Sequence, residues 1–278
     1  MDTDKLKKML TRLAMEPPFR MLAWGLFHVF KPSARTRAVW SIGPRHMYLL
    51  GVVTAAELAT KQQVPSISVI EFGVAGGKGL LALQEEAAAV ENELGVEIKV
   101  YGFDAGGGLP HLIGDYRDHP DIFRPGDYPM DEDALRSRLT SRTTLILGHV
   151  AETVGGFFDK YDPPPIGFAS FDLDLYSSTR DALKIFTRPN KRMLRQVPLY
   201  FDDIDQLQYH KFAGELLAIE EFNQENSAVK IDRWYGVRRE VAFPERSYLD
   251  QLFVAHDLDA ISQTTLNRDI EQWTKLRS

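Results

Sequence analysis

Two pairs of aspartates are the residues of this sequence best suited to chemistry. The segment FDLDLYSST carries Asp172 and Asp174, and the segment LYFDDID carries Asp202 and Asp203. Each pair follows an apolar run typical of a buried strand, and open α/β sheets bind ligands at the carboxyl ends of their strands. If the two strands are neighbours, their axes lie about 4.8 Å apart. Three or four carboxylates then meet at one edge of the sheet.

A cluster of this kind predicts a metal ion. Side chains two residues apart on a strand share a face, which places Asp172 and Asp174 together. Because like charges repel and burial disfavours the charged form, we expect a cation to compensate. Oxygen ligands without histidine or thiolate favour Mg²⁺, with Mn²⁺ or Ca²⁺ as alternatives. The other interpretation is that these aspartates cap helices and turns.

The elements that must position these residues alternate regularly along the chain. Continuous β-branched and aromatic runs, typical of buried parallel strands, are separated by helical patterns of period 3.6. The expected strands are 66–74, 97–104, 143–150, 165–175 and 196–203, with a hairpin over 228–243. Such alternation predicts an α/β fold, a doubly wound and mostly parallel seven-stranded sheet of Rossmann-like type with helices on both faces.

The chain divides into three expected parts around this sheet. Residues 1–63 form a helical extension or lid, residues 64–245 form the sheet domain, and residues 246–278 form a helical tail packed on it. The extension contains helices predicted at 3–15 and 19–30. The second of these, FRMLAWGLFHVF, is shorter than the roughly 20 apolar residues that a membrane span needs. We expect it to pack in the core or to form a homo-oligomer, with association at a membrane surface as the alternative.

The composition excludes several classes of protein. The 278 residues carry 33 Lys and Arg against 39 Asp and Glu, a net charge of −6 that provides no basic surplus for nucleic acid. There is no cysteine, which excludes a disulfide scaffold, a thiolate zinc site and a thiol nucleophile. The first residues lack the features of a signal peptide. We therefore expect a cytoplasmic protein without an integral membrane part.

The turn after the first strand, VIEFGVAGGKG, indicates a bound cofactor. Glu71 ends the strand, and Gly73, Gly76 and Gly77 let the backbone approach a ligand near the start of the next helix. A dinucleotide site would open with G-x-G-x-x-G directly after the strand, but the nearest match begins at Gly77, several residues too late. The pattern acid-x-Gly-x-x-x-Gly favours S-adenosylmethionine (SAM). A plain tight turn is the remaining interpretation.

Other polar residues stand at or near the strand ends. Asp104 ends the second strand, where an acidic side chain can hold two ribose hydroxyls. His149 ends the third strand, where adenine would lie, although simple packing is the alternative. His210 follows the Asp-Asp pair and could contact substrate or act as a base. The segment 105–130 could form a mobile lid, and the basic segment 32–45 is either a solvated loop or a lid.

These motifs together resemble the macrocin O-methyltransferase family, class I SAM-dependent enzymes that methylate sugar hydroxyls of natural products with Mg²⁺. VIEFGVAGG resembles the first motif of that family, DAGGGLP its Asp…Gly-Leu-Pro segment, and LGHVAETV a later segment in which Glu152 replaces an aspartate. FDLDLYSSTRDAL resembles its Asp-x-Asp-x-Tyr-x-Ser-Thr signature and is the most specific match. LYFDDI resembles the Asp-Asp strand end that follows. The resemblance covers roughly residues 45–235.

The resemblance implies a role for each matching residue. Asp174 would be the general base, and 64–245 would be the methyltransferase domain. His210, to which the resemblance assigns no role, is the alternative base because it follows the Asp-Asp pair. The metal ligands would be Asp172, Asp202 and Asp203. The cofactor-binding set comprises Glu71, Gly73, Val74, Gly76, Gly77, Asp104, His149, Val150 and Asp172. The acceptor would be a small molecule with vicinal hydroxyls, either a sugar of a natural product or glycan or a catechol-like diol, chelated by Mg²⁺.

Two other functions remain open at this point. One is an NAD-type oxidoreductase on a Rossmann fold, against which the displaced glycine pattern counts. The other is a catalytically silent member of the fold, against which the four carboxylates count. Neither the acceptor nor the oligomeric state follows from the sequence.

Overall fold

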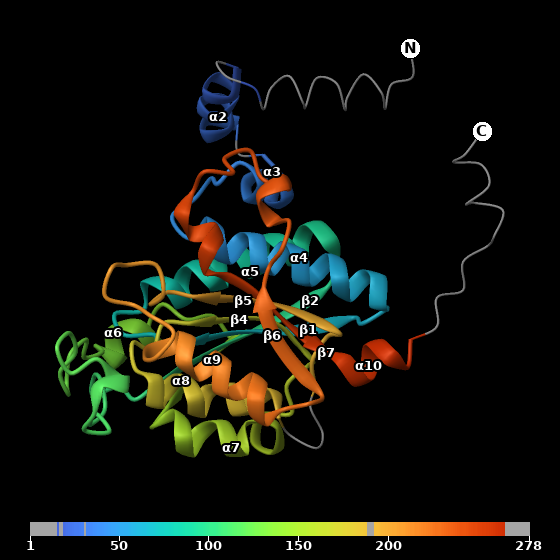
Figure 1. Cartoon of the computed structure of the whole chain (residues 1–278). Coiled ribbons are helices and arrows are strands. Elements are labelled where there is room, and N and C mark those ends of the chain that lie inside the picture. The colour runs from blue at the N-terminus through green and yellow to red at the C-terminus, as the bar shows by residue number, and fades with distance from the viewer. Residues whose placement is uncertain (1–15, 17–18, 31, 188–191, 265–278) are drawn as a thin grey trace, which may run out of the picture.

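A single mixed sheet organises the molecule. The structure is a computed structural model that describes residues 16, 19–30, 32–187 and 192–264. In this part of the chain seven strands lie in the order β3-β2-β1-β4-β5-β7-β6 (Figure 1). They are β1 (Ser66–Phe72), β2 (Glu97–Asp104), β3 (Thr143–Leu147), β4 (Ile166–Phe171), β5 (Gln196–Phe201), β6 (Val229–Arg233) and β7 (Leu252–Asp257). Strands β1 to β5 are parallel, and β7 is antiparallel to both of its neighbours. The doubly wound, mostly parallel sheet is confirmed.

Helices cover both faces of this sheet. Helices α4 and α5 lie on one face, and α7, α8 and α9 lie on the other (Figure 1). The helices are α2 (Phe19–Phe30), α3 (Ala34–Val39), α4 (His46–Gln62), α5 (Lys78–Leu94), α6 (Glu132–Arg136), α7 (Val150–Tyr161), α8 (Tyr176–Leu183), α9 (Gly214–Glu225) and α10 (Leu258–Ser262). Short 3-10 turns are η1 (Tyr116–Asp118), η2 (Lys184–Phe186), η3 (Val237–Arg239) and η4 (Ser247–Gln251).

A row of phenylalanines fixes the carboxyl ends of the four central strands. Phe103 stacks on Phe72, Phe72 on Phe171, and Phe171 on Phe201, with ring centroids 4.9, 5.0 and 4.7 Å apart. All four rings are buried, and each burial contributes about 1.5–3 kcal/mol. Each phenylalanine also pairs in register with its neighbour across the sheet. The residues that follow them are therefore held in one line at the sheet edge.

The predicted ends of the sheet domain need correction. The expected hairpin over 228–243 is wrong, because β6 pairs with β7. The sequence ERSYLDQLFVAHDL, at the start of the expected helical tail, also predicts a helix. This prediction is wrong, because the second half of the segment is β7 and a 3-10 turn precedes it. The physical reason is burial between two strands. In β7 the side chains of Leu252, Phe253 and Ala255 are buried against the sheet, whereas a helix packed on the outside would bury one stripe only.

Helix α2 is confirmed at the predicted residues, while the helix predicted at 3–15 lies outside the described residues. Trp24 and Phe27 on α2 pack against a small separate core that contains Trp40 and Phe243. The opposite side of α2 is apolar and exposed, and Leu22 is an example. None of the helices in the described part of the chain is long and apolar enough to cross a membrane. A homo-oligomer through the N-terminal helices stays a prediction, as does the division into three parts.

The segment 32–45 is folded rather than a solvated loop. Helix α3 occupies its centre and buries Ala34 and Ala38. Arg37 on α3 makes a bidentate ion pair with Glu86 on α5, at 2.8 and 2.7 Å. Pairs of this geometry combine charge with directional hydrogen bonds. They tie the N-terminal segment to α5, so the chain enters α4 at a fixed position beside the sheet.

Candidate active site

A cavity of about 790 Å³ lies at the carboxyl ends of the central strands. The structure brings nearly all of the predicted site residues to its wall: Glu71, Gly73, Val74, Gly76, Asp104, His149, Val150, Asp172, Asp174, Asp202 and Asp203. Two predicted residues do not line it. Gly77 sits just behind the wall as the N-cap of α5, and His210 lies in an exposed loop, where its ring contacts His119 and Phe212.

Close approaches of the backbone explain two glycines of the turn after β1. Gly73 has φ +84°, and a Cβ there would lie 1.7 Å from the carbonyl oxygen of Asp172. Gly77 has φ +79°, and a Cβ there would lie 2.4 Å from Leu135. Gly76 differs, because a Cβ would meet no atom within 4 Å. Gly73 and Gly77 are thus required by the fold, whereas Gly76 leaves room in the cavity.

The carboxylate of Asp104 holds this glycine turn in place by accepting hydrogen bonds from its backbone. Its Oδ2 accepts hydrogen bonds from the backbone N–H groups of Val74 and Ala75, both at 2.8 Å. Its Oδ1 accepts a third from Gly106 at 2.6 Å. The carboxylate therefore joins the ends of β1 and β2. Because Asp104 also lines the cavity, its predicted contact with ribose would come in addition to this structural role.

Glu71 is a buried carboxylate with one acceptor left over. Its side chain is 1% exposed, and Tyr48 donates a hydrogen bond to its Oε1 at 2.9 Å. Its Oε2 has no partner among the described residues. Burial, reinforced by the charge of Asp172, raises the pKa of Glu71 to about 8. Gly79 provides the necessary space, because a Cβ there would lie 1.8 Å from Oε1.

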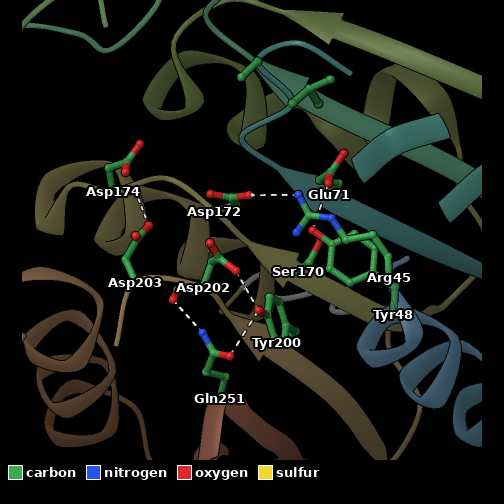
Figure 2. A network of polar contacts seen from close by, with 12 residues as sticks. Arg45, Tyr48, Glu71, Ser170, Asp172, Asp174, Tyr200, Asp202, Asp203 and Gln251 are labelled. Atoms are coloured by element: carbon green, nitrogen blue, oxygen red, sulfur yellow. Dashed lines mark hydrogen bonds and ion pairs between the residues drawn. The ribbon is translucent and has the colours of Figure 1, made fainter. Parts of the chain in front are cut away.

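The four predicted aspartates come together (Figure 2). Strands β4 and β5 are neighbours, so Asp172 and Asp202 leave the sheet side by side. The predicted reason for the position of Asp174 was wrong, because β4 ends at Phe171 and strand alternation does not reach residue 174. Instead, Asp174 turns with φ +62°, and its N–H donates to Oδ2 of Asp203 at 3.2 Å.

The acidic cluster disfavours its own ionisation. Burial, followed by the charges of neighbouring carboxylates, raises the pKa of Asp172 to about 7 and that of Asp174 to about 8. Burial also raises the pKa of Asp203 to about 6, although a hydrogen bond from Tyr209 opposes the shift. These groups lack enough positive charge around them.

Several partners of the aspartates escaped the sequence analysis. Tyr200 donates a hydrogen bond to Oδ1 of Asp202 at 2.6 Å, and Tyr209 donates to Oδ1 of Asp203 at 2.8 Å. Tyr200 could have been found, because residues two apart on a strand share a face. Glu215 on α9, fully buried, accepts from the N–H of Asp203 at 3.1 Å. No sequence signal marks that pairing across twelve residues.

Two further residues of the site, a partner of Glu71 and a partner of Asp172, come from helix α4 and its cap. Tyr48, on the first turn of α4, is fully buried against β4 and β5 through Phe168 and Tyr200. Arg45 immediately precedes α4, and its Nη2 lies 4.0 Å from Oδ2 of Asp172. Both residues lie far from the motifs in sequence. The sheet edge is therefore completed by a segment that precedes β1.

The loop from 105 to 130 forms a wall of the cavity. Ile113 and Tyr128 are among its residues that line the space. Asp118, fully buried, accepts hydrogen bonds from the N–H of Ile113 at 2.9 Å and from the N–H and Oγ of Ser177 at 2.8 and 2.9 Å. Because Ser177 belongs to the first turn of α8, this aspartate attaches the loop to the helix that follows the DLD motif.

The acidic cluster offers the donors that a divalent cation binds. Asp172, Asp202 and Asp203 supply carboxylate oxygens, the ligands that Mg²⁺ prefers, and their excess negative charge calls for a cation. Within the described ranges, however, no group of three or more histidine or acidic side chains is arranged to hold a metal ion. Tyr200 and Tyr209 engage one oxygen each of Asp202 and Asp203. The donor chemistry fits, and binding requires the side chains to reorient.

The fit to SAM follows from the shape and polarity of the opposite part of the cavity. The unpartnered Oε2 of Glu71 is a buried acceptor at the wall, and the backbone at Gly76 is open to the space. Helix α5 starts beside the turn at Lys78. An acceptor for an ammonium group and a backbone open to close approach are both present. The residues therefore fit the cofactor.

The fold and the position of the cavity define a class of protein. The sheet order, with β7 antiparallel between β5 and β6, is that of the class I SAM-dependent methyltransferase fold. Ligands bind in this type of sheet at the carboxyl ends of the strands, where the cavity lies.

The chain is similar to several solved structures. The calicheamicin methyltransferase CalS11 superposes with a TM-score of 0.52 at 19% identity, over 92% of this chain and 94% of that chain. The O-methyltransferase NovP gives a TM-score of 0.46 at 17% identity, over 63% and 69% of the two chains. MycE from the mycinamycin biosynthetic pathway, in complex with Mg and SAH, gives 0.41 at 14% identity, over 88% and 60%. No family model and no curated protein sequence matches this chain. At these identities the likeness to CalS11 establishes the fold.

Proposed function

We propose that this protein is a SAM-dependent O-methyltransferase that acts on a hydroxyl of a small molecule with vicinal hydroxyls, a sugar of a natural product or glycan. The observation that carries the proposal is one cavity that joins the glycine turn and Glu71 to the four aspartates. A cofactor side and an acidic side in one space are what transfer between SAM and a chelated diol requires. The fold of CalS11, whose name describes a methyltransferase, supports it.

Different residues of this chain would bind the cofactor and exclude water in the proposed reaction. SAM would supply an electrophilic methyl group attached to a sulfonium. The acceptor oxygen would form a bond to that methyl carbon while the methyl C–S bond breaks, and the electron pair of the broken bond would stay on the sulfur of the leaving S-adenosylhomocysteine. Glu71 and the backbone around Gly76 would hold the methionine part of the cofactor, and Asp104 the ribose. The ordered loop from 105 to 130 would limit access of water from one side.

Asp174 is the proposed general base. It must take the proton of the acceptor hydroxyl, and a base works best when its pKa lies near the working pH. The pKa of Asp174, raised by burial and by Asp203, is about 8. A divalent cation would supply Lewis-acid polarisation of the acceptor oxygens. Asp172, Asp202 and Asp203 would hold it, by the fit described above.

The proposal is tested by isothermal titration of the full chain with S-adenosylhomocysteine and, separately, with NAD⁺. We expect saturable binding of S-adenosylhomocysteine and no heat with NAD⁺. Transfer is then measured with methyl-labelled SAM and a panel of sugar and catechol diols, with Mg²⁺ and with excess chelator. We expect labelled product with Mg²⁺ and its loss with the chelator.

Paired variants locate the chemistry. Asp174→Asn should lower turnover by about 10²–10⁴-fold, the usual contribution of a general base, with S-adenosylhomocysteine binding unchanged. Asp159→Asn is the matched control, since this aspartate is exposed on α7 away from the cavity. Binding of NAD⁺ in place of S-adenosylhomocysteine would contradict the proposal and favour an NAD-type oxidoreductase.

A further inference from the structure

Arg45 places a guanidinium at the wall of the cavity, between the carboxylates of Glu71 and Asp172 (Figure 2). The residue is the N-cap of α4, and its carbonyl oxygen accepts hydrogen bonds from the N–H groups of Tyr48 and Leu49. Its side chain runs over the ring of Tyr48, with Cζ 5.3 Å from the ring centroid. The start of a long helix and a buried aromatic ring therefore hold this cation in place.

The guanidinium of Arg45 makes no hydrogen bond at a normal distance within the described part of the chain. Among the described residues, its one acidic contact is with Asp172, at 4.0 Å, which is longer than the 2.7–2.9 Å of a charge-assisted hydrogen bond. An arginine offers five N–H donors in a fixed fork. Arg37, eight residues earlier, shows the alternative, because it closes on Glu86 with two bonds at 2.8 and 2.7 Å. Arg45 makes no such bidentate ion pair with Asp172.

A guanidinium and a buried carboxyl group thus stand side by side at one place. Glu71 has an unpartnered buried oxygen, and Arg45 has unused donors directed to the same cavity. An α-amino acid group presents the complementary pair, since its ammonium and its carboxylate are attached to one carbon. The methionine part of SAM and of S-adenosylhomocysteine carries such a group. A simple cation or a neutral sugar would match only one half of this arrangement.

We propose that Arg45 binds the α-carboxylate of the methionine part of SAM, while Glu71 faces the ammonium group. This inference rests on the proposed function and adds to it the residue that recognises the amino-acid end of the cofactor. Arg45 then acts through a fork matched to a carboxylate. It distinguishes the complete cofactor from adenosine derivatives that lack the carboxylate.

The test is a thermodynamic cycle of binding by isothermal titration, without an acceptor and with excess chelator. The wild-type chain and Arg45→Met are each titrated with SAM, decarboxylated SAM and 5′-methylthioadenosine. Wild type should bind SAM about 10- to 100-fold more tightly than decarboxylated SAM, the range for hydrogen bonds between charged groups. Arg45→Met should lose most of that preference and bind the other two ligands within about twofold of wild type.

Two further variants keep the result interpretable. Arg45→Lys retains the charge without the fork and should give an intermediate preference for SAM. Arg35→Met, on the preceding helix, removes an exposed arginine paired with Glu57 and should keep the full preference. Thermal unfolding of each variant confirms that it is folded.

The outcomes separate the two proposals. If wild type binds SAM but Arg45→Met weakens the binding of SAM and of decarboxylated SAM equally, Arg45 has only a structural role. The inference then fails while the proposed function stands. An unchanged preference in Arg45→Met also overturns the inference. If wild type binds none of the three ligands, the proposed function fails, and the inference fails with it.

Discussion

Two aspartates that flank β1 at the same edge of the sheet have opposite surroundings. Asp104, the last residue of β2, accepts three backbone hydrogen bonds. Asp172, after β4, has one distant guanidinium at 4.0 Å and carboxylates on its other sides. At equivalent strand ends, the fold supplies hydrogen-bond donors to the carboxylate of Asp104. It supplies too little positive charge to balance the carboxylate of Asp172.

The difference separates architecture from ligand binding. A carboxylate whose acceptors are used by the backbone stabilises the turn that it holds. A carboxylate whose pKa is raised by burial and by like charges costs stability whenever it is ionised, and a bound ligand can relieve that cost. By this criterion the glycine turn is preformed, and the acidic end of the cavity is the part that a ligand completes.

The largest expected effect comes from replacing the two aspartates by asparagine. Asp104→Asn should lower the free energy of unfolding by about 2–4 kcal/mol, because an amide group must then face a backbone N–H. Asp172→Asn should be neutral or stabilising at pH 8, since the pKa of this carboxyl is about 7 and its charge is disfavoured. Urea unfolding of both variants with chelator checks the contrast. An equal loss of unfolding free energy in the two variants would contradict the distinction between a structural Asp104 and a ligand-binding Asp172.

A divalent cation should stabilise the acidic end specifically. Mg²⁺ or Mn²⁺ at about 100 times its dissociation constant adds about 2.7 kcal/mol to the stability of a protein that binds it only when folded. The gain should disappear in Asp202→Asn and remain in Asp159→Asn. Thermal unfolding against cation concentration measures it, and a gain that Asp202→Asn retains would place the cation elsewhere.

The next effect is a pH dependence carried by Glu71. Its pKa rises from an ordinary 4.5 to about 8 on folding, so between these values the folded state binds more protons than the unfolded state. The contribution is fully present below pH 4.5 and is lost as pH rises towards 8, at no more than about 1.4 kcal/mol per pH unit.

Glu71→Gln removes this titration with little change in shape. The variant should match wild type near pH 5 and become the more stable protein as pH approaches 8. Unfolding free energies are compared across that range in the presence of chelator. A constant difference between the two proteins would mean that Glu71 is ionised throughout.

The smallest expected effect on stability separates two glycines of one turn. Gly76→Ala should change the free energy of unfolding by less than about 0.5 kcal/mol, because its Cβ meets nothing within 4 Å. The added methyl group enters the cavity and should weaken S-adenosylhomocysteine by roughly tenfold or more. Gly73→Ala, whose Cβ would overlap the carbonyl of Asp172, should instead destabilise the fold. Comparable stabilities for the two variants would contradict this.

The sequence allowed the central sheet and one edge of the cavity to be predicted. Buried parallel strands are continuous apolar runs, and each of the central ones ends in a phenylalanine followed by a turn or an acidic residue, as in Phe171-Asp172 and Phe201-Asp202. Register across the sheet then brings the acidic residues together without further information. Local pattern and sheet topology were sufficient for this part.

Contacts between distant segments could not be predicted in the same way. Arg45 and Tyr48 reach the site because the ion pair of Arg37 with Glu86 holds α3 against α5. No periodic pattern in the sequence predicts that contact. Strand β7 was misassigned because SYLDQLFVAHDL carries apolar residues at helical spacings as well as at alternate positions. Its pairing with β5, a tertiary contact, decides the outcome.

The position of β7 has a consequence for how the protein is made. This strand, Leu252–Asp257, is inserted between β5 and β6, and Gln251 just before it donates a hydrogen bond to the carbonyl oxygen of Asp202 at 2.7 Å. During vectorial synthesis the outer edge of β5 lacks this partner until β7 has left the ribosome. The glycine turn can therefore form on the nascent chain earlier than the acidic half of the cavity, which is completed only when β7 pairs with β5.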